Sequence, residues 1–120
     1  MENNHETGAA GEKIACQYLT GQGYLIIDRN CRCGRGEIDI VARDGRHICF
    51  VEVKARRDLM YGYPREAVGP WKQQQIKKVA QIYIKKKRLY NESFRFDVVE
   101  IMLNEDDTAK SVVLIKNAFQ

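Results

Sequence analysis

The sequence contains no apolar run near the ~18 residues that span a bilayer, and its start, MENNHE, lacks the basic and apolar regions of a secretory signal. Only two prolines stand against 44% hydrophobic and 30% charged residues, which excludes collagenous and disordered chains. The four cysteines are too few for a disulfide framework, and Cys31 and Cys33 lack the second pair that a zinc ribbon needs. We therefore expect a globular cytoplasmic protein with no membrane partner, in which residues 1–120 form a single domain.

Positive charge is in small excess, +4, but it is unevenly placed along the chain. Residues 67–91 carry seven Lys or Arg and no acid, whereas residues 97–107 carry five acids and no base. A one-sided basic element is typical of a polyanion partner, although a solvated helix face gives the same pattern. The charge distribution alone leaves both explanations open.

Hydrophobic periodicity predicts two helices and five strands in the order αβββαββ. The helices are expected at residues 7–22, capped by Thr7, and 70–89, begun by Pro70. The strands are expected at residues 24–30, 37–43, 47–54, 94–103 and 111–116. Asp44 and Gly45 predict a two-residue hairpin turn between the second and third strands, and residues 55–69 a long surface loop.

The hairpin turn determines which side chains of the two strands it joins share a face. With the loop so placed, Glu37 lies opposite Glu52, and Asp39 lies opposite Phe50 and diagonal to Glu52. Alternation then puts the acids and Lys54 on one face together with Val41. The opposite face is expected to hold Ile38, Ile40, Cys49, Val51 and Val53.

Opposed carboxylates roughly 5 Å apart at Cβ destabilise a sheet, so this group of acids needs compensation. Lys54 supplies one positive charge against three negative ones. A bound divalent cation, raised carboxylate pKa values and splaying into solvent are the alternatives. Splaying fits poorly, because residues 47–53 are largely apolar on both faces before the charges begin, as expected for a central strand covered on two sides.

Oxygen ligands from Asp39 and Glu52 suit Mg²⁺ or Mn²⁺, which typically complete their coordination with water and substrate phosphate. Lys54, on the same face, can orient an attacking water or stabilise the charge that develops on the phosphoryl oxygens. Glu12 adds a fourth carboxylate at the edge of the inward face of the first helix. Its position is explained equally well by a place in the metal site and by stabilisation of the helix dipole.

These residues resemble a known signature. Asp39, followed after twelve residues by Glu52-Val53-Lys54, resembles the D-x(n)-E-x-K motif of the PD-(D/E)XK nuclease superfamily. More narrowly, the segments GEKIACQYL, GEIDIVARDG, FVEVKAR, the G-x-P-x-EAV of residues 62–68 and RFDVVEI together resemble the YraN family, proteins similar to archaeal Holliday-junction resolvases. The resemblance implies an α/β, restriction-endonuclease-like fold with an αβββαβ core, a mixed central sheet flanked by helices and, here, an extra C-terminal strand.

The resemblance also implies an active site. It places the catalytic residues at Glu12, Asp39, Glu52 and Lys54, with Glu37 adjacent and Asp97 as a further matched acid. The metal ligands, for Mg²⁺ or Mn²⁺, are expected at Asp39, Glu52, the Val53 carbonyl and Glu37. Ile38 stands where the superfamily name has proline, which leaves the ligand set whole.

Three functions remain open at this point: a metal-dependent nuclease acting on DNA in repair or recombination, a non-catalytic nucleic-acid-binding module, and an accessory subunit of a DNA-processing complex. In the last case the acidic residues 97–107 are one contact surface. Similarity to junction resolvases implies a homodimer, since a two-fold substrate calls for paired sites. Contacts with the phosphate backbone are expected from Arg56, Arg57, Lys72, Lys77, Lys78, Lys85 and Lys86.

Overall fold

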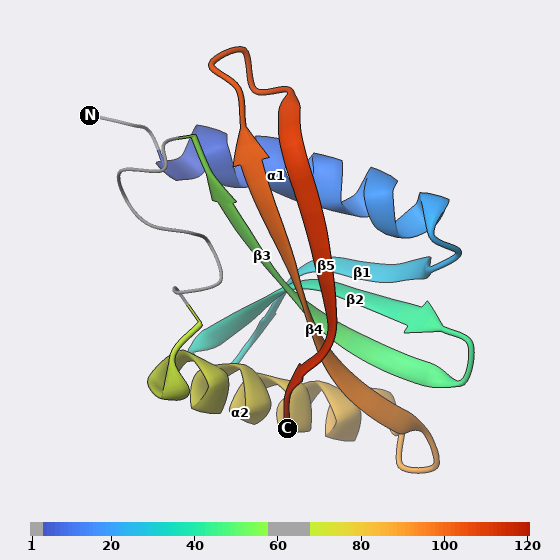
Figure 1. Cartoon of the computed structure of the whole chain (residues 1–120). Helices are drawn as coiled ribbons and strands as arrows, with labels where there is room; N and C mark the ends of the chain where they lie inside the picture. Colours follow the sequence, from blue (N-terminus) through green and yellow to red (C-terminus); the bar gives the residue numbers. More distant parts are fainter. Residues whose placement is uncertain (1–3, 58–67) are drawn as a thin grey trace.

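A five-stranded sheet forms the centre of the protein, in a computed structural model that describes residues 4–57 and 68–120 (Figure 1). The elements are helices α1 (Asn4–Gly21) and α2 (Pro70–Lys87) and strands β1 (Leu25–Cys33), β2 (Gly36–Asp44), β3 (His47–Arg56), β4 (Ser93–Leu103) and β5 (Ala109–Phe119). The strand order is β1-β2-β3-β4-β5, with β3 and β4 parallel and the other neighbours antiparallel. The predicted α/β class, mixed sheet, element order and extra C-terminal strand are confirmed.

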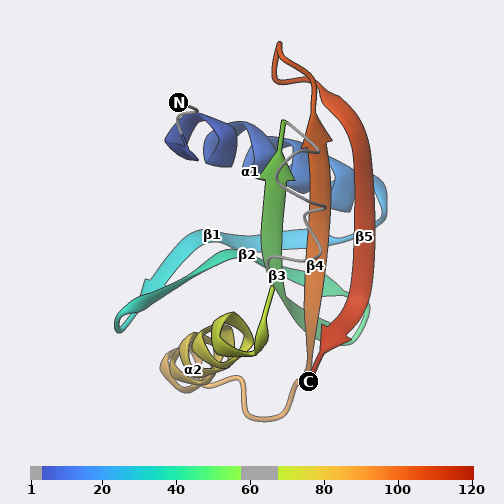
Figure 2. The same ribbon diagram turned by 60° about the vertical axis from the view of Figure 1, so that its left-hand side comes forward.

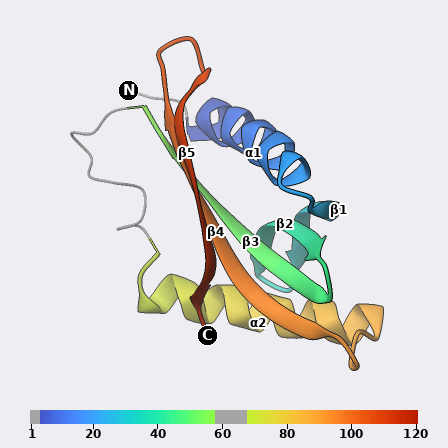
Figure 3. The same ribbon diagram turned by 45° about the vertical axis from the view of Figure 1, so that its right-hand side comes forward.

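The two helices cover opposite faces of the sheet (Figure 3). Leu19 of α1 belongs to an apolar cluster that includes Val51 of β3, whereas Val79 of α2 belongs to one that includes Phe50. Successive residues of β3 alternate between the clusters, so β3 is the central, doubly covered strand that its composition predicts. Within the described residues, neither helix is long and apolar enough to cross a membrane.

The helix ends follow the predicted signals except at the start of α1. That helix begins at Asn4, so Thr7 lies inside it and the predicted cap is wrong. It ends at Gly21, and Gly23 then adopts a φ of 93°, which lets the N–H of Tyr24 donate to the Leu19 carbonyl at 2.9 Å. Helix α2 begins at Pro70, as predicted, and ends at Lys87.

Strand β1 is longer than predicted, because the Arg- and Gly-rich segment after Asn30 continues the hairpin with β2. Arg32 pairs with Glu37, and the turn falls at Gly34, whose φ is 63°. Gly36 then lets the hairpin press against α2, since a Cβ there would collide with Cγ2 of Val79. Strand β3 also continues beyond its predicted end, to Arg56, and residues 58–67 of the expected loop lie outside the described residues.

The turn between β2 and β3 lies one residue later than predicted. Gly45 and Arg46 form the loop, and Asp44 pairs with His47. A positive φ at Gly45 alone, 60°, is the pattern of a type II′ turn, which needs glycine at its first position. Asp44 stays in the strand, where its Oδ2 accepts a hydrogen bond from Nη2 of Arg95 at 2.7 Å.

This turn moves the pairing of β2 and β3 by two residues, so the side chains within the ladder keep their predicted faces but change their partners. Val41, not Asp39, lies opposite Phe50. The prediction that Glu37 opposes Glu52 is also wrong, because the ladder ends at the Ile40 and Val51 pair.

Strand β2 breaks its alternation where it leaves β3. Ile38 packs in the cluster under α2 and Ile40 in the cluster under α1, although strict alternation predicts one face for both. Figure 2 shows β1 and β2 running across the direction of β3, β4 and β5. Asp39 therefore lies at the point where β2 diverges from β3, which we call the split in the sheet.

Candidate active site

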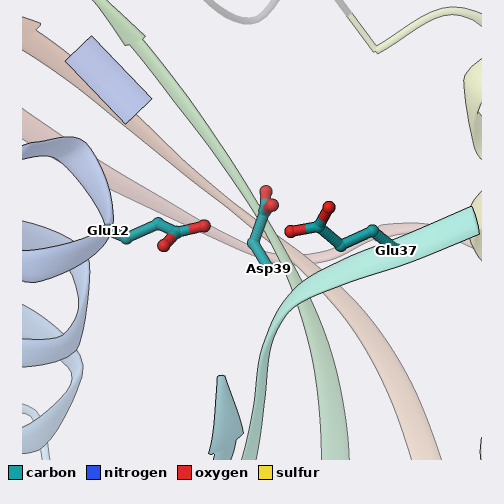
Figure 4. A group of neighbouring side chains, drawn as sticks. All are labelled: Glu12, Glu37 and Asp39. Atoms are coloured by element: carbon teal, nitrogen blue, oxygen red, sulfur yellow. The ribbon is translucent and has the colours of Figure 1, made fainter. Parts of the chain in front are cut away.

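Three carboxylates from two elements lie together beside the C-terminal part of β3. Glu12 of α1 and Glu37 and Asp39 of β2 each offer one oxygen, and these oxygens all lie within 4.8 Å of one another. The side chains point toward one another (Figure 4). A cleft of about 220 Å³ adjoins them, lined by Gly8, Glu12, Asp39, Val53, Lys54, Ala55 and Arg56.

Glu12 reaches this group because α1 approaches β3 closely. A Cβ on Gly11 would lie only 2.7 Å from Cβ of Ala55 and 3.6 Å from Cγ1 of Val53, so glycine permits the contact. Helix α1 begins at Asn4, which places Glu12 beyond the first turn, where the helix dipole acts. Of the two explanations for Glu12, the geometry favours the carboxylate group.

Asp39 is held at the split in the sheet by a backbone contact. Its Oδ2 accepts a hydrogen bond from the N–H of Val53 at 2.8 Å. This contact lies just beyond the last backbone pair between β2 and β3, which is Ile40 with Val51. Burial raises the pKa of the Asp39 carboxyl from 3.8 to about 7, and the nearby Glu52 carboxylate contributes to the rise. The Val53 hydrogen bond opposes it.

Glu52 is only 5% exposed and, among the residues that the structure describes, contacts two lysines. Its Oε1 lies 3.3 Å from Nζ of Lys54, on the same strand, and 3.6 Å from Nζ of Lys72, on α2. Glu52 does not belong to the close group of three acids, although the sequence predicts it as a principal metal ligand. It influences that group through its charge on Asp39.

The acids are thus compensated in two ways. At Asp39 and Glu12 the carboxyl pKa values are raised, which lowers the negative charge that these groups carry. For Glu12, burial is the largest cause of the raised pKa, and a side-chain hydrogen bond from Asn30 opposes it. At Glu52 the negative charge is compensated by the nearby ammonium groups of Lys54 and Lys72. Splaying into solvent, which the sequence disfavours, is true only of Glu37, the exposed member of the group.

The donor set fits a hard divalent cation. Carboxylate oxygens alone, with no thiol or imidazole in the group, are the ligands that Mg²⁺ and Mn²⁺ prefer. A cation would also relieve the repulsion among partly buried acids, which raises their pKa values. Glu12, Glu37 and Asp39 could therefore hold the metal, with Glu52 next to them.

The cationic residues expected to contact nucleic acid fall into separate places. Arg56 lines the cleft, and Lys72 contacts Glu52. Arg57 is engaged by Asp107, whose Oδ1 accepts a hydrogen bond from its Nε at 2.9 Å. Among the other α2 lysines predicted to bind phosphate, Lys77 is half-buried, and Lys78, Lys85 and Lys86 are exposed.

Asp97 is buried apart from the candidate site. It is fully buried, its Oδ1 accepts from Nε of Arg95 at 2.8 Å, and its Oδ2 accepts from the Tyr24 hydroxyl at 2.8 Å. Glu100 is also buried, so the expected acidic surface at residues 97–107 is not formed as such. Of its five acids, the exposed ones are Glu105 and Asp106.

Sequence reasoning missed three features of this region. It assigned Lys72 to the phosphate backbone and not to Glu52, it did not consider Asn30 as a partner of Glu12, and it passed over Trp71. The sequence does contain a signal for Trp71, because a tryptophan directly after Pro70 belongs to the first turn of α2, next to a strongly basic helix face. Asn30, with a φ of 51°, had none.

Comparisons with known proteins give a consistent family. A family model described as "Uncharacterised protein family UPF0102" matches residues 11–101, a range that contains every acid of the candidate site. A UPF0102 protein of Clostridium botulinum (strain Loch Maree / Type A3) is 51% identical over 118 residues, covering 98% of this chain and 96% of the relative. A UPF0102 protein of Clostridium kluyveri is 48% identical over 117 residues, with the same two coverages.

Proposed function

The chain belongs to the UPF0102 family, and we propose that it is a metal-dependent nuclease of the PD-(D/E)XK superfamily. It hydrolyses phosphodiester bonds of nucleic acid, with DNA in repair or recombination as the expected substrate, and it acts as a homodimer. The observation that carries this proposal is the convergence of Glu12, Glu37 and Asp39 beside a cleft that Lys54 also lines.

Each residue has a role that follows from its position. Glu12, Glu37 and Asp39 would hold Mg²⁺ or Mn²⁺, which supplies charge for the phosphoryl oxygens and lowers the pKa of an attacking water. Lys54 lines the same cleft, where an ammonium group can donate to the attacking water or to a phosphoryl oxygen. Glu52 keeps Lys54 at this position through the contact at 3.3 Å.

A second candidate function has its own support. Glu52 is balanced by Lys54 and Lys72, so this buried carboxylate does not itself require a metal ion. A nucleic-acid-binding module that does not cut would use the basic face of α2 and Arg56 and would need no metal.

A cleavage screen with Mg²⁺ and Mn²⁺ across single-stranded, duplex, flap and branched DNA and RNA separates the two candidates. Asp39→Ala, Glu52→Ala and Lys54→Ala should each abolish cleavage, with non-additive losses because the residues act as one unit. Glu105→Ala, which removes an exposed acid in the turn between β4 and β5, is the matched control and should cleave as the parent does. Equal trace cleavage in the parent and all three site variants indicates a contaminant and refutes the nuclease.

Metal binding is tested separately by thermal melting. Mg²⁺ or Mn²⁺ should raise the melting temperature of the parent, because a ligand of the native state stabilises it by mass action. Asp39→Asn should lose most of that increase. Lys54→Ala should keep it, since an ammonium is not a metal ligand, and should lose only the cleavage.

A further inference from the structure

A second, larger depression lies next to the candidate active site, between the β1–β2 turn and the first turns of α2. Its volume is about 500 Å³. Gly36 and Val79, which lie against each other, are among its lining residues. The residues that matter for the argument are Arg32, Arg35, Glu37, Trp71 and Lys72, all of which line it, and we call it the Trp71 groove.

The Trp71 groove adjoins the candidate active site at two of its lining residues. Glu37 lines the groove and also belongs to the group of acids within 4.8 Å of one another. Lys72 lines the groove and also lies 3.6 Å from Glu52. A chain molecule lying in the groove therefore lies beside Glu37, one of the three clustered acids.

The side chains of the groove suit a polyanion. Among the described residues that line it, three are cations, Arg32, Arg35 and Lys72, and one is an acid, Glu37, whose Oε2 lies 3.9 Å from Nε of Arg32. Arg32 is 83% exposed in its side chain and so can turn toward a phosphate. Arginine and lysine beside an open channel are what phosphate-backbone binding needs.

Trp71 adds a feature that backbone binding does not explain. It is 75% exposed, although it stands on a helix whose buried side holds Ile76, Val79, Ala80 and Tyr83. An indole exposed to water does not contribute the stabilisation that a buried tryptophan usually gives to a fold. An exposed aromatic ring within a cationic groove is the combination on which unpaired bases stack.

We propose that the Trp71 groove binds a single-stranded segment of nucleic acid, with a base stacked on Trp71 and its phosphates on Arg32, Arg35 and Lys72. The inference rests on the proposed nuclease function and specifies its substrate class: nucleic acid with unpaired nucleotides next to the cleaved bond. Bases inside an intact duplex stack on one another and cannot offer a face to the indole.

Trp71 is the single tryptophan of the chain, so its own fluorescence reports the contact. The parent protein, in the absence of metal, is titrated with a thymidine oligonucleotide and with a blunt duplex of equal length. The single strand should quench the emission in a saturable way, and the duplex should quench it much less. No quenching by the single strand, or equal quenching by the duplex, overturns the proposal.

Variants test the energetic contribution by anisotropy of a labelled oligonucleotide. Trp71→Ala should weaken single-strand binding about 5- to 100-fold, as expected for the loss of one stacked base, and Trp71→Phe should restore most of it. Tyr90→Ala is the matched control, because Tyr90 is a 65% exposed aromatic residue just beyond the end of α2, and it should bind as the parent does. Parent-like binding by Trp71→Ala refutes the stacking.

These measurements fail independently of the nuclease proposal. Cleavage that depends on Asp39 without quenching of Trp71 leaves the nuclease standing and removes the stacking groove. Quenching by the single strand and weakened binding in Trp71→Ala, without cleavage of any substrate, keeps the groove and leaves the non-catalytic binding module.

Discussion

Asp39→Asn should make the metal-free protein more stable at neutral and alkaline pH. Burial and the Glu52 carboxylate raise the pKa of Asp39 from 3.8 to about 7, so holding it ionised costs at most roughly 4 kcal/mol of folding free energy. Asparagine has nearly the same shape, is neutral at every pH and can still accept the hydrogen bond from the Val53 N–H. The substitution therefore removes the charge and keeps the contact.

The sign and the pH window follow from the direction of the shift. Between pH 3.8 and about 7 the folded parent binds more protons at Asp39 than the unfolded chain does, so its free energy of unfolding falls as the pH rises. Near pH 4 the carboxyl is protonated in the folded state, and the parent and the variant should have similar stability. Above pH 7 the difference should reach its full size, in favour of the variant.

Urea unfolding from about pH 4 to pH 8, without metal and then with Mg²⁺, measures this difference. Asp44→Asn is a control of opposite sign: its hydrogen bond from Arg95 is the largest cause of a lowered Asp44 pKa, so removing the charge should destabilise at neutral pH and matter less in acid. Mg²⁺ should stabilise the parent and not Asp39→Asn. An Asp39→Asn protein less stable than the parent at alkaline pH without metal would falsify the idea that this carboxylate is held at a cost.

Three further predictions concern packing and charge. Gly36→Ala should lower the free energy of unfolding by about 1–3 kcal/mol in urea titrations, because its Cβ would collide with Val79; parent-like stability contradicts this packing. Gly11→Ala should move α1 away from Ala55 and reduce the Mg²⁺-induced rise in melting temperature, and an unchanged rise places Glu12 outside the metal site. Replacing four α2 lysines by glutamine should lower the magnitude of the slope of log affinity against log salt on duplex DNA by about 0.9 for each phosphate that the helix no longer binds. An unchanged slope would show that this helix face does not bind phosphate. These four are Lys77, Lys78, Lys85 and Lys86.

The faces of the residues paired between β2 and β3 could be predicted from the sequence, although their partners could not. Period-two alternation needs only the parity of the register, and the observed turn at Gly45 and Arg46 changes the register by two residues. Val41 and Phe50 consequently still share a face, as predicted. A turn that moved the register by one residue would have sent Glu52 to the side of α1.

The departures come from contacts between elements far apart in the sequence. The break in β2 separates Ile38 from Ile40, and strand periodicity has no signal for it, because both residues are apolar and buried on either face. At the break, Asp39 accepts a hydrogen bond from the N–H of Val53, a contact across fourteen residues that only the folded sheet brings together. A hairpin drawn as a regular ladder therefore assigns the wrong neighbours to Asp39 and Glu37.

Trp71 and Lys72 show how much the sequence pattern of a helix can predict about the site. They are consecutive in α2, about 100° apart around its axis, and the helix alone does not say which of them faces the acids. That choice depends on how α2 lies across the sheet, where Val79 packs against Gly36 of β2 and Tyr83 packs beside Phe50 of β3. With α2 so placed, Lys72 meets Glu52 and Trp71 remains on the rim of the groove. The same packing that buries the apolar stripe of α2 thus separates a cation that balances the buried acid from an aromatic ring available to a ligand.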